Sequence, residues 1–99
     1  MKYRVRYTKA AKEDLLRLYE FLVKYDLEAA RRALDAIRKS IDLLQDFPFT
    51  CRKASSDNPF LREMVIGFGD NGYVALFEIE VENIVTILAV RHQREEDYY

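Results

Sequence analysis

The sequence predicts an α+β domain with the element order β-α-α-β-β-β, in which a helical hairpin packs on one face of a mainly antiparallel four-stranded sheet. Three observations support this fold class. The first residues alternate between apolar and charged side chains, the apolar residues of 11–44 recur at helical spacing, and three apolar segments separated by turns follow residue 60. The apolar spacing therefore changes from two residues to about 3.6 and back to two, which places the helices between the first strand and the others.

Residues 2–7 form the first predicted strand. Charged and apolar side chains alternate strictly along it, in the order Lys2, Tyr3, Arg4, Val5, Arg6, Tyr7. An alternation of this kind is typical of a strand that buries one face and leaves the other in water.

Two helices follow, and each is preceded by a residue that can cap its first turn. Thr8 precedes the first helix and Asp26 the second, and both side chains can accept hydrogen bonds from the free N–H groups of a helix start. The second helix is expected to end near Asp46, because Pro48 cannot continue it. Apolar residues recur at three- and four-residue steps through both helices: Ala11, Leu15, Leu18, Leu22, Tyr25, then Ala30, Ala33, Ile37, Ile41, Leu44.

Three more strands are predicted at residues 61–68, 73–79 and 84–90, after a polar loop at residues 50–59. Gly69-Asp70-Asn71-Gly72 separates the first two, and Asn-Gly tolerates the positive φ angles of a tight hairpin turn. Residues 80–83 turn the chain before the last strand. Short turns between consecutive strands favour an antiparallel meander.

The chain is expected to form one domain, residues 1–99, because its length is typical of a single small domain. The formal charge is −1, from 16 Lys and Arg against 17 Asp and Glu. Proteins that bind nucleic acid usually carry a basic surplus, so this balance argues against general nucleic-acid binding. The longest apolar run, residues 84–90, is far shorter than the roughly 20 residues that span a bilayer. With no signal-peptide core in the first residues, a cytoplasmic protein without a membrane contact is expected.

Side chains that can do chemistry gather at the end of the last predicted strand. Arg91 and His92 follow its apolar residues directly, and Arg94, Tyr98 and Tyr99 come after them. Arginine grips phosphates and carboxylates with a planar fork, histidine titrates near neutral pH, and tyrosine stacks on bases or transfers a proton. The same residues also suit a solvated terminus whose ion pairs contribute little to stability.

Arg62 has two interpretations that the residues leave open. Alternation places its side chain on the same face as Met64 and Ile66, near the start of a strand. It is either a sheet-edge cation paired with a carboxylate such as Glu78 or Glu80, or a rigidly held cation for a phosphate or a partner carboxylate.

No cofactor or metal site is expected. The single histidine and the single cysteine, Cys51, are some 40 residues apart and have no ligand spacing around them. Arg52 and Lys53 stand beside Cys51 and could lower the pKa of its thiol. We nevertheless interpret Cys51 as a partly buried loop residue rather than a nucleophile.

Five short segments, taken in order, carry a resemblance to a known family. They are Tyr7-Thr8-Lys9-Ala10-Ala11-Lys12-Glu13-Asp14-Leu15, Leu44-Gln45-Asp46-Phe47-Pro48, Leu61-Arg62-Glu63, Gly72-Tyr73-Val74 and Val90-Arg91-His92-Gln93-Arg94-Glu95. Together they resemble the RelE/ParE superfamily of type II toxins over essentially the whole chain. The Leu-Arg-Glu and Arg-His-Gln-Arg-Glu segments look closest to the ParE-like branch.

The resemblance implies a RelE/ParE-like fold and a toxin that a cognate antitoxin keeps inactive. ParE-like members poison DNA gyrase and are not thought to be nucleases, and the nearly neutral charge of this chain favours that branch. The residues expected to contact the target are Arg62, Arg91, His92 and Arg94, with none of them catalytic. The residues expected to bind an acidic antitoxin segment that folds on binding are Arg31, Arg32 and Arg38.

The alternative is a RelE-like, metal-independent endoribonuclease that cuts messenger RNA on the ribosome. In that case Arg62 and Arg91 would stabilise the charged phosphorane. His92, or a glutamate of the tail, would take the 2′-hydroxyl proton, and Tyr98 would orient the base or protonate the leaving oxygen. A third interpretation is a degenerate toxin that only binds its antitoxin.

Overall fold

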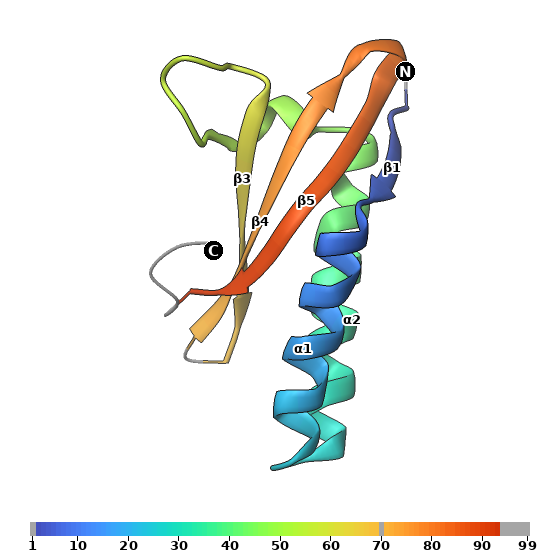
Figure 1. Cartoon of the computed structure of the whole chain (residues 1–99), viewed down its shortest axis with the longest axis vertical. Helices are drawn as coiled ribbons and strands as arrows, with labels where there is room; N and C mark the ends of the chain where they lie inside the picture. The colour runs from blue at the N-terminus through green and yellow to red at the C-terminus, as the bar shows by residue number, and fades with distance from the viewer. Residues whose placement is uncertain (1, 70, 94–99) are drawn as a thin grey trace.

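The computed structural model describes residues 2–69 and 71–93, and it has the predicted α+β architecture with both helices on one side of the sheet (Figure 1). The sheet has five strands in the order β1-β5-β4-β3-β2. The elements are β1 (Arg4–Tyr7), α1 (Lys9–Val23), α2 (Leu27–Asp42), β2 (Arg52–Lys53), β3 (Leu61–Phe68), β4 (Asn71–Glu80) and β5 (Ile84–His92), with short 3-10 turns at η1 (Leu43–Gln45), η2 (Pro48–Thr50) and η3 (Val81–Asn83).

Both predicted helix caps are confirmed. The Thr8 hydroxyl accepts a hydrogen bond from the Ala11 N–H at 3.1 Å and donates one to the Ile87 carbonyl at 3.1 Å. The Asp26 carboxylate accepts from the N–H groups of Glu28 and Ala29. The α-helical part of α2 ends at Asp42, earlier than expected, and η1 continues it. A final turn that tightens to 3-10 geometry is frequent at the C-terminus of an α-helix, and Pro48 follows it in the chain.

The four-stranded prediction was wrong by one strand. β2 lies inside the segment expected to be a loop, where Arg52 pairs with Glu63 and Lys53 with Arg62 of β3. Both β2 residues are polar and exposed, and a strand of two residues has no alternation for a sequence pattern to detect. β1 runs parallel to β5, whereas the other pairs are antiparallel.

β4 begins earlier than predicted. Phe68 pairs with Asn71 and Gly67 with Gly72, so Asn71 and Gly72 belong to β4 rather than to the turn. Gly69 takes the positive φ, at 61°. Gly72 is needed for a different reason, because a Cβ there would collide with the backbone carbonyl oxygen of Ile66.

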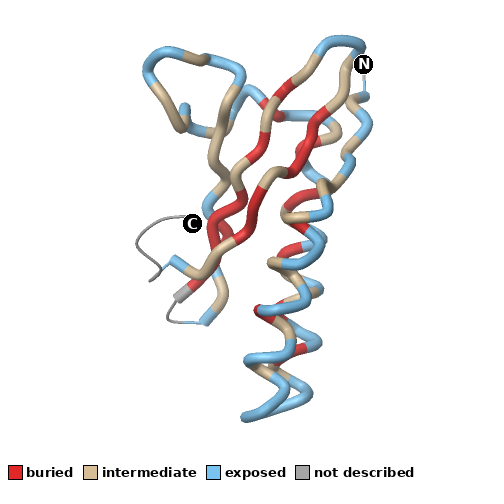
Figure 2. The backbone as a smooth tube through the Cα atoms, viewed as in Figure 1, coloured by how far each residue is buried: buried red, intermediate tan, exposed pale blue. Residues whose placement is uncertain are grey.

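The hydrophobic core lies between the helical hairpin and the sheet (Figure 2). Its most deeply buried large side chains are Ile37, Ile41, Leu44, Ile66, Phe77, Val85, Ile87 and Val90. Beyond Ile87, where β1 no longer pairs with β5, the Asp14 carboxylate of α1 accepts a hydrogen bond from the Val90 N–H at 2.9 Å. In the described part of the chain no helix is long and apolar enough to cross a membrane.

Candidate functional site

A β-bulge decides how the predicted C-terminal site is arranged. Phe77 of β4 pairs with Ile87, but the preceding Leu76 pairs with Ala89, so Leu88 has no partner across the ladder. One extra residue reverses the alternation of the strand beyond it. As a result Ile87 and Val90 both pack in the core, His92 shares the helix-facing side with Val90, and Arg91 lies on the far face of the sheet.

His92 belongs to an aromatic cluster at the end of the sheet. It pairs directly with Tyr73, and the two rings meet edge to face at a centroid distance of 5.5 Å. The ring of Tyr73 also packs against that of Phe68, with the two ring centroids 6.3 Å apart. Burial raises the pKa of Tyr73 above its usual value, so its phenol stays protonated at neutral pH. These contacts give His92 a packing role.

Arg91 stands on the far face, opposite Val74 of β4, which in turn pairs with Val65 of β3. Its side chain is half-buried, and its Nη1 donates a hydrogen bond to the His92 carbonyl at 3.3 Å. Val65 is 50% exposed. The far face thus presents a cation held by a strand, with an exposed apolar side chain in the same cross-strand row.

Arg62 does not pair with Glu78 or Glu80. Its Nε donates to the Pro59 carbonyl at 2.6 Å. Its Nη1 donates to the carbonyls of Cys51 at 2.8 Å and Phe49 at 3.2 Å, and the guanidinium lies 5.3 Å from the Phe49 ring centroid. Glu80 instead accepts hydrogen bonds from Arg6. The guanidinium therefore joins η2, the residue between η2 and β2, and the loop before β3.

Replacing Arg62 with alanine is expected to destabilise the fold by about 2 kcal/mol, because hydrogen bonds to a charged group contribute roughly 1.5–3 kcal/mol and the carbonyls lose their donor. Lysine keeps the charge but not the fork, so Arg62→Lys should recover less than half of the loss. Urea unfolding measures both. Arg31→Ala, at an exposed arginine of α2, is the matched control and should leave stability unchanged. Equal stability of Arg62→Ala and the parent protein would contradict this bracing role.

The structure does not bring the candidate nuclease residues together. Arg62 pairs with Phe77 of β4 and His92 with Tyr73, a separation along β4 of about 13 Å at roughly 3.3 Å per residue. Arg91 is on the opposite face from both. Arg94 and Tyr98 lie outside the described residues.

Cys51 is not an activated thiol. Burial raises the pKa of Cys51, and the Arg62 guanidinium offsets only part of that rise. The neighbouring Arg52 side chain is bonded elsewhere, since its Nε donates to the Glu63 carboxylate at 3.0 Å. A thiol with a raised pKa is a poor nucleophile at neutral pH.

The two helices form a second candidate site, a groove of about 260 Å³ on their outer side. We define this interhelical groove by its lining: Lys12, Leu15, Leu16, Tyr19, Leu34 and Arg38. Of the arginines expected to bind an antitoxin, Arg38 lines the groove and Arg31 lies in the same helical row, at i−7. Arg32 is exposed and turned about 100° around the helix from Arg31.

Sequence reasoning missed the α1 side of this groove. Leu16 is 57% exposed although it lies next to the buried-face position Leu15. The available signal was an apolar residue outside the helical stripe with a lysine four residues before it. The exposed Leu16 adds apolar area to the groove between the cations of Lys12 and Arg38.

Comparison with known proteins decides the family. Residues 5–97 match the profile of the ParE toxin of the type II toxin–antitoxin system parDE. The chain belongs to the ParE toxin family. The predicted resemblance to the RelE/ParE superfamily is therefore confirmed, and the protein is a ParE-type toxin of a toxin–antitoxin system. No curated protein sequence matches it.

Solved structures share the fold of this ParE-type toxin. A chain of the chromosomal ParDE toxin–antitoxin system from P. aeruginosa superposes with a TM-score of 0.75 at 21% identity, covering 92% of this chain and 96% of that one. A chain of the RelBE2 toxin–antitoxin complex from Mycobacterium tuberculosis gives 0.67 at 24% identity, covering 94% and 100%. At these identities the likeness concerns the fold.

Proposed function

We propose that this ParE-type toxin acts in the cytoplasm by binding DNA gyrase, without a reaction of its own, and that a cognate antitoxin neutralises it. One observation carries the choice against RNA cleavage: Arg62, Arg91 and His92, which a nuclease needs around one phosphate, lie at separate places on two faces of the sheet. A general base and its oxyanion stabilisers must all reach the same reacting group within hydrogen-bond distance.

The antitoxin is proposed to occupy the interhelical groove. Leu16, Tyr19 and Leu34 form an apolar floor, and Lys12 and Arg38 add positive charge beside it. An amphipathic helix that carries acidic residues fits such a surface, with its apolar side on the floor and its carboxylates beside the cations. The two structural neighbours are themselves toxin–antitoxin complexes, which supports a partner of this kind.

The target contact is proposed at the end of β5, on the face that carries Arg91. A cation fixed by a strand loses little conformational entropy on binding and presents its guanidinium fork to a carboxylate. Val65 offers apolar area in the same row. Arg62 is proposed to act indirectly, by stabilising the fold that carries this surface, since its guanidinium donates hydrogen bonds to backbone carbonyls. Arg94 stays in the proposed contact on sequence grounds.

His92→Ala tests the choice of mechanism. A protein-binding toxin should keep most of its toxicity, because the change removes an aromatic contact worth about 0.5–1.5 kcal/mol. A nuclease that uses His92 as its base should lose roughly 10²–10⁴-fold in rate. Growth and transcript integrity after induction are the readouts, with circular dichroism to verify folding. Cleavage of transcripts by the parent toxin, abolished in a folded His92→Ala variant, would overturn the proposal.

A further inference from the structure

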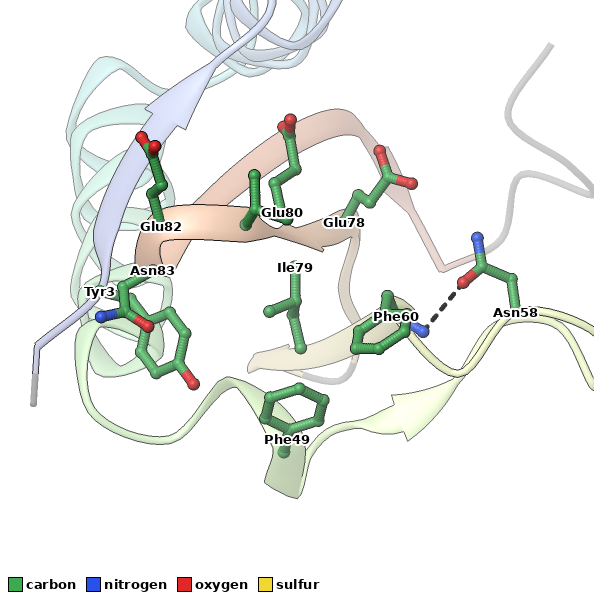
Figure 3. Close-up of a pocket in the computed structure, with 10 residues that line it drawn as sticks. Tyr3, Phe49, Asn58, Phe60, Glu78, Ile79, Glu80, Glu82 and Asn83 are labelled. Atoms are coloured by element: carbon green, nitrogen blue, oxygen red, sulfur yellow. Dashed lines mark hydrogen bonds between the residues drawn. The ribbon is translucent and has the colours of Figure 1, made fainter.

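The first half of β5 is held between two strands. It pairs with β4 on one side and with β1 on the other, as far as Ile87. Side chains alternate regularly in this region: Ile79 of β4 points into a pocket, whereas Glu78 and Glu80 point to the opposite face (Figure 3). On that face the Glu80 carboxylate accepts hydrogen bonds from Arg6 of β1. Backbone pairing and an ion pair across β5 therefore hold β1 against this half of the strand.

The second half of β5 has α1 beside it instead of β1. After β1 ends, the chain turns into α1, which lies along the continuing part of β5 (Figure 1). The Thr8 hydroxyl donates to the carbonyls of Ile87 at 3.1 Å and Leu88 at 3.3 Å. Further along α1, the Asp14 carboxylate accepts from the Val90 N–H at 2.9 Å. Two side chains of the helix thus bind β5, one at the bulge and one just beyond it.

The Asp14 carboxylate is well placed to supply an acceptor that the sheet lacks. Its side chain is only 15% exposed, and its other oxygen lies 3.7 Å from the guanidinium of Arg17, one turn along the helix. Val90 is fully buried, and a buried N–H without an acceptor is costly. A bulge disrupts the ladder locally, so the Val90 N–H takes its partner from outside the sheet. A carboxylate is the stronger kind of acceptor for such a bond.

We propose that Asp14 is a positioning residue for Arg91 and thereby for the target contact. Val90 and Arg91 are consecutive, so the hydrogen bond from Asp14 fixes the backbone one residue before the guanidinium-bearing side chain. With β4 on one side and Asp14 on the other, the end of β5 is held against fraying, and Arg91 keeps its place opposite Val74. An ordered strand loses less conformational entropy when its side chain binds a partner.

The inference rests on the proposed function and deepens it. It assigns part of the target contact to a helix residue that lies neither in the interhelical groove nor on the face that carries Arg91. The role is one of position, because Asp14 acts on the contact only through the backbone of β5.

Hydrogen exchange of the free toxin, followed by NMR, tests this role. In Asp14→Ala the amides of Val90 and Arg91 should exchange about tenfold faster or more, because the buried Val90 N–H loses its acceptor. Val85 lies between β1 and β4 and is the internal reference, since a loss of overall stability would accelerate its exchange equally. The nuclear Overhauser contacts between the side chains of Arg91 and Val74 should weaken in the same variant.

Two further variants separate the hydrogen bond from the charge. Asp14→Asn keeps an acceptor oxygen in place and should bring exchange at Val90 back to within about threefold of the parent rate. Glu13→Ala removes the same charge from an exposed position of α1 and should change neither readout.

Three results would each overturn the proposal: equal acceleration at Val90 and Val85 in Asp14→Ala, unchanged contacts between Arg91 and Val74, or no recovery in Asp14→Asn. Both readouts use the free toxin without gyrase, antitoxin or a growth assay. A failure of the positioning role is therefore distinct from a failure of the proposed function.

Discussion

Toxicity is expected to disappear when Arg91 is replaced by alanine, while the fold stays intact. Arg91 is fixed by its place in β5 opposite Val74, and its guanidinium lies on the face away from the helices. Removing one partner of a desolvated, hydrogen-bonded charge pair at an interface costs about 2–5 kcal/mol, which corresponds to a loss of roughly 30-fold or more in affinity. A toxin that inhibits its target by binding to it should then leave most of the target unbound at ordinary expression levels and lose its toxicity.

Growth after induction measures this effect, and circular dichroism of the purified variant verifies folding. Arg4→Ala is the matched control, because Arg4 is an exposed arginine of the edge strand β1 and pairs with Ile84, at the opposite end of β5 from Arg91. It loses the same charge and should remain fully toxic. Full toxicity of Arg91→Ala would remove the end of β5 from the candidate target contact.

Antitoxin binding is expected to weaken by about 100-fold or more in the double variant Leu16→Glu and Arg38→Glu. The first change places a carboxylate on the apolar floor of the interhelical groove, and the second reverses the charge beside it. Hot-spot substitutions in interfaces cost about 2 kcal/mol or more each, and opposed like charges add to the loss. Both side chains are exposed or line the groove, so folding should survive.

Calorimetric titration with the antitoxin measures this loss. Arg32→Glu makes the same charge reversal on α2 outside the groove and should reduce affinity by less than about fivefold, as expected for a peripheral charge. If Arg32→Glu weakens the complex as much as the double variant, the antitoxin follows the α2 surface rather than the groove.

Local signals predicted most of the fold. Thr8 and Asp26 were recognisable as caps because a short oxygen-bearing side chain before an apolar helical stripe satisfies free N–H groups. The strands were recognisable because one of their faces is buried. β2 was not predicted, because Arg52 and Lys53 have no strand pattern of their own and are a strand only through their pairing with β3. The Asn-Gly pair led to a misplaced hairpin turn. Gly72 is required not for a turn but because the backbone carbonyl of Ile66 lies too close to leave room for a Cβ.

The candidate site was less predictable, for a definite reason. The bulge at Leu88 lies in the run Leu88-Ala89-Val90, where every side chain is apolar, so alternation cannot show which residue is inserted. That single residue decides which face carries Arg91 and which carries His92. Arg62 was correctly placed on the same face of β3 as Met64 and Ile66. Its carbonyl partners come from a segment whose path the sequence does not specify.

The most direct test adds the purified toxin separately to a gyrase supercoiling reaction and to ribosomes translating a defined messenger RNA. The account predicts that the toxin inhibits gyrase, that prior addition of the antitoxin relieves the inhibition, and that the messenger RNA stays intact. Cleavage of the messenger RNA on the ribosomes, with gyrase fully active, would contradict it.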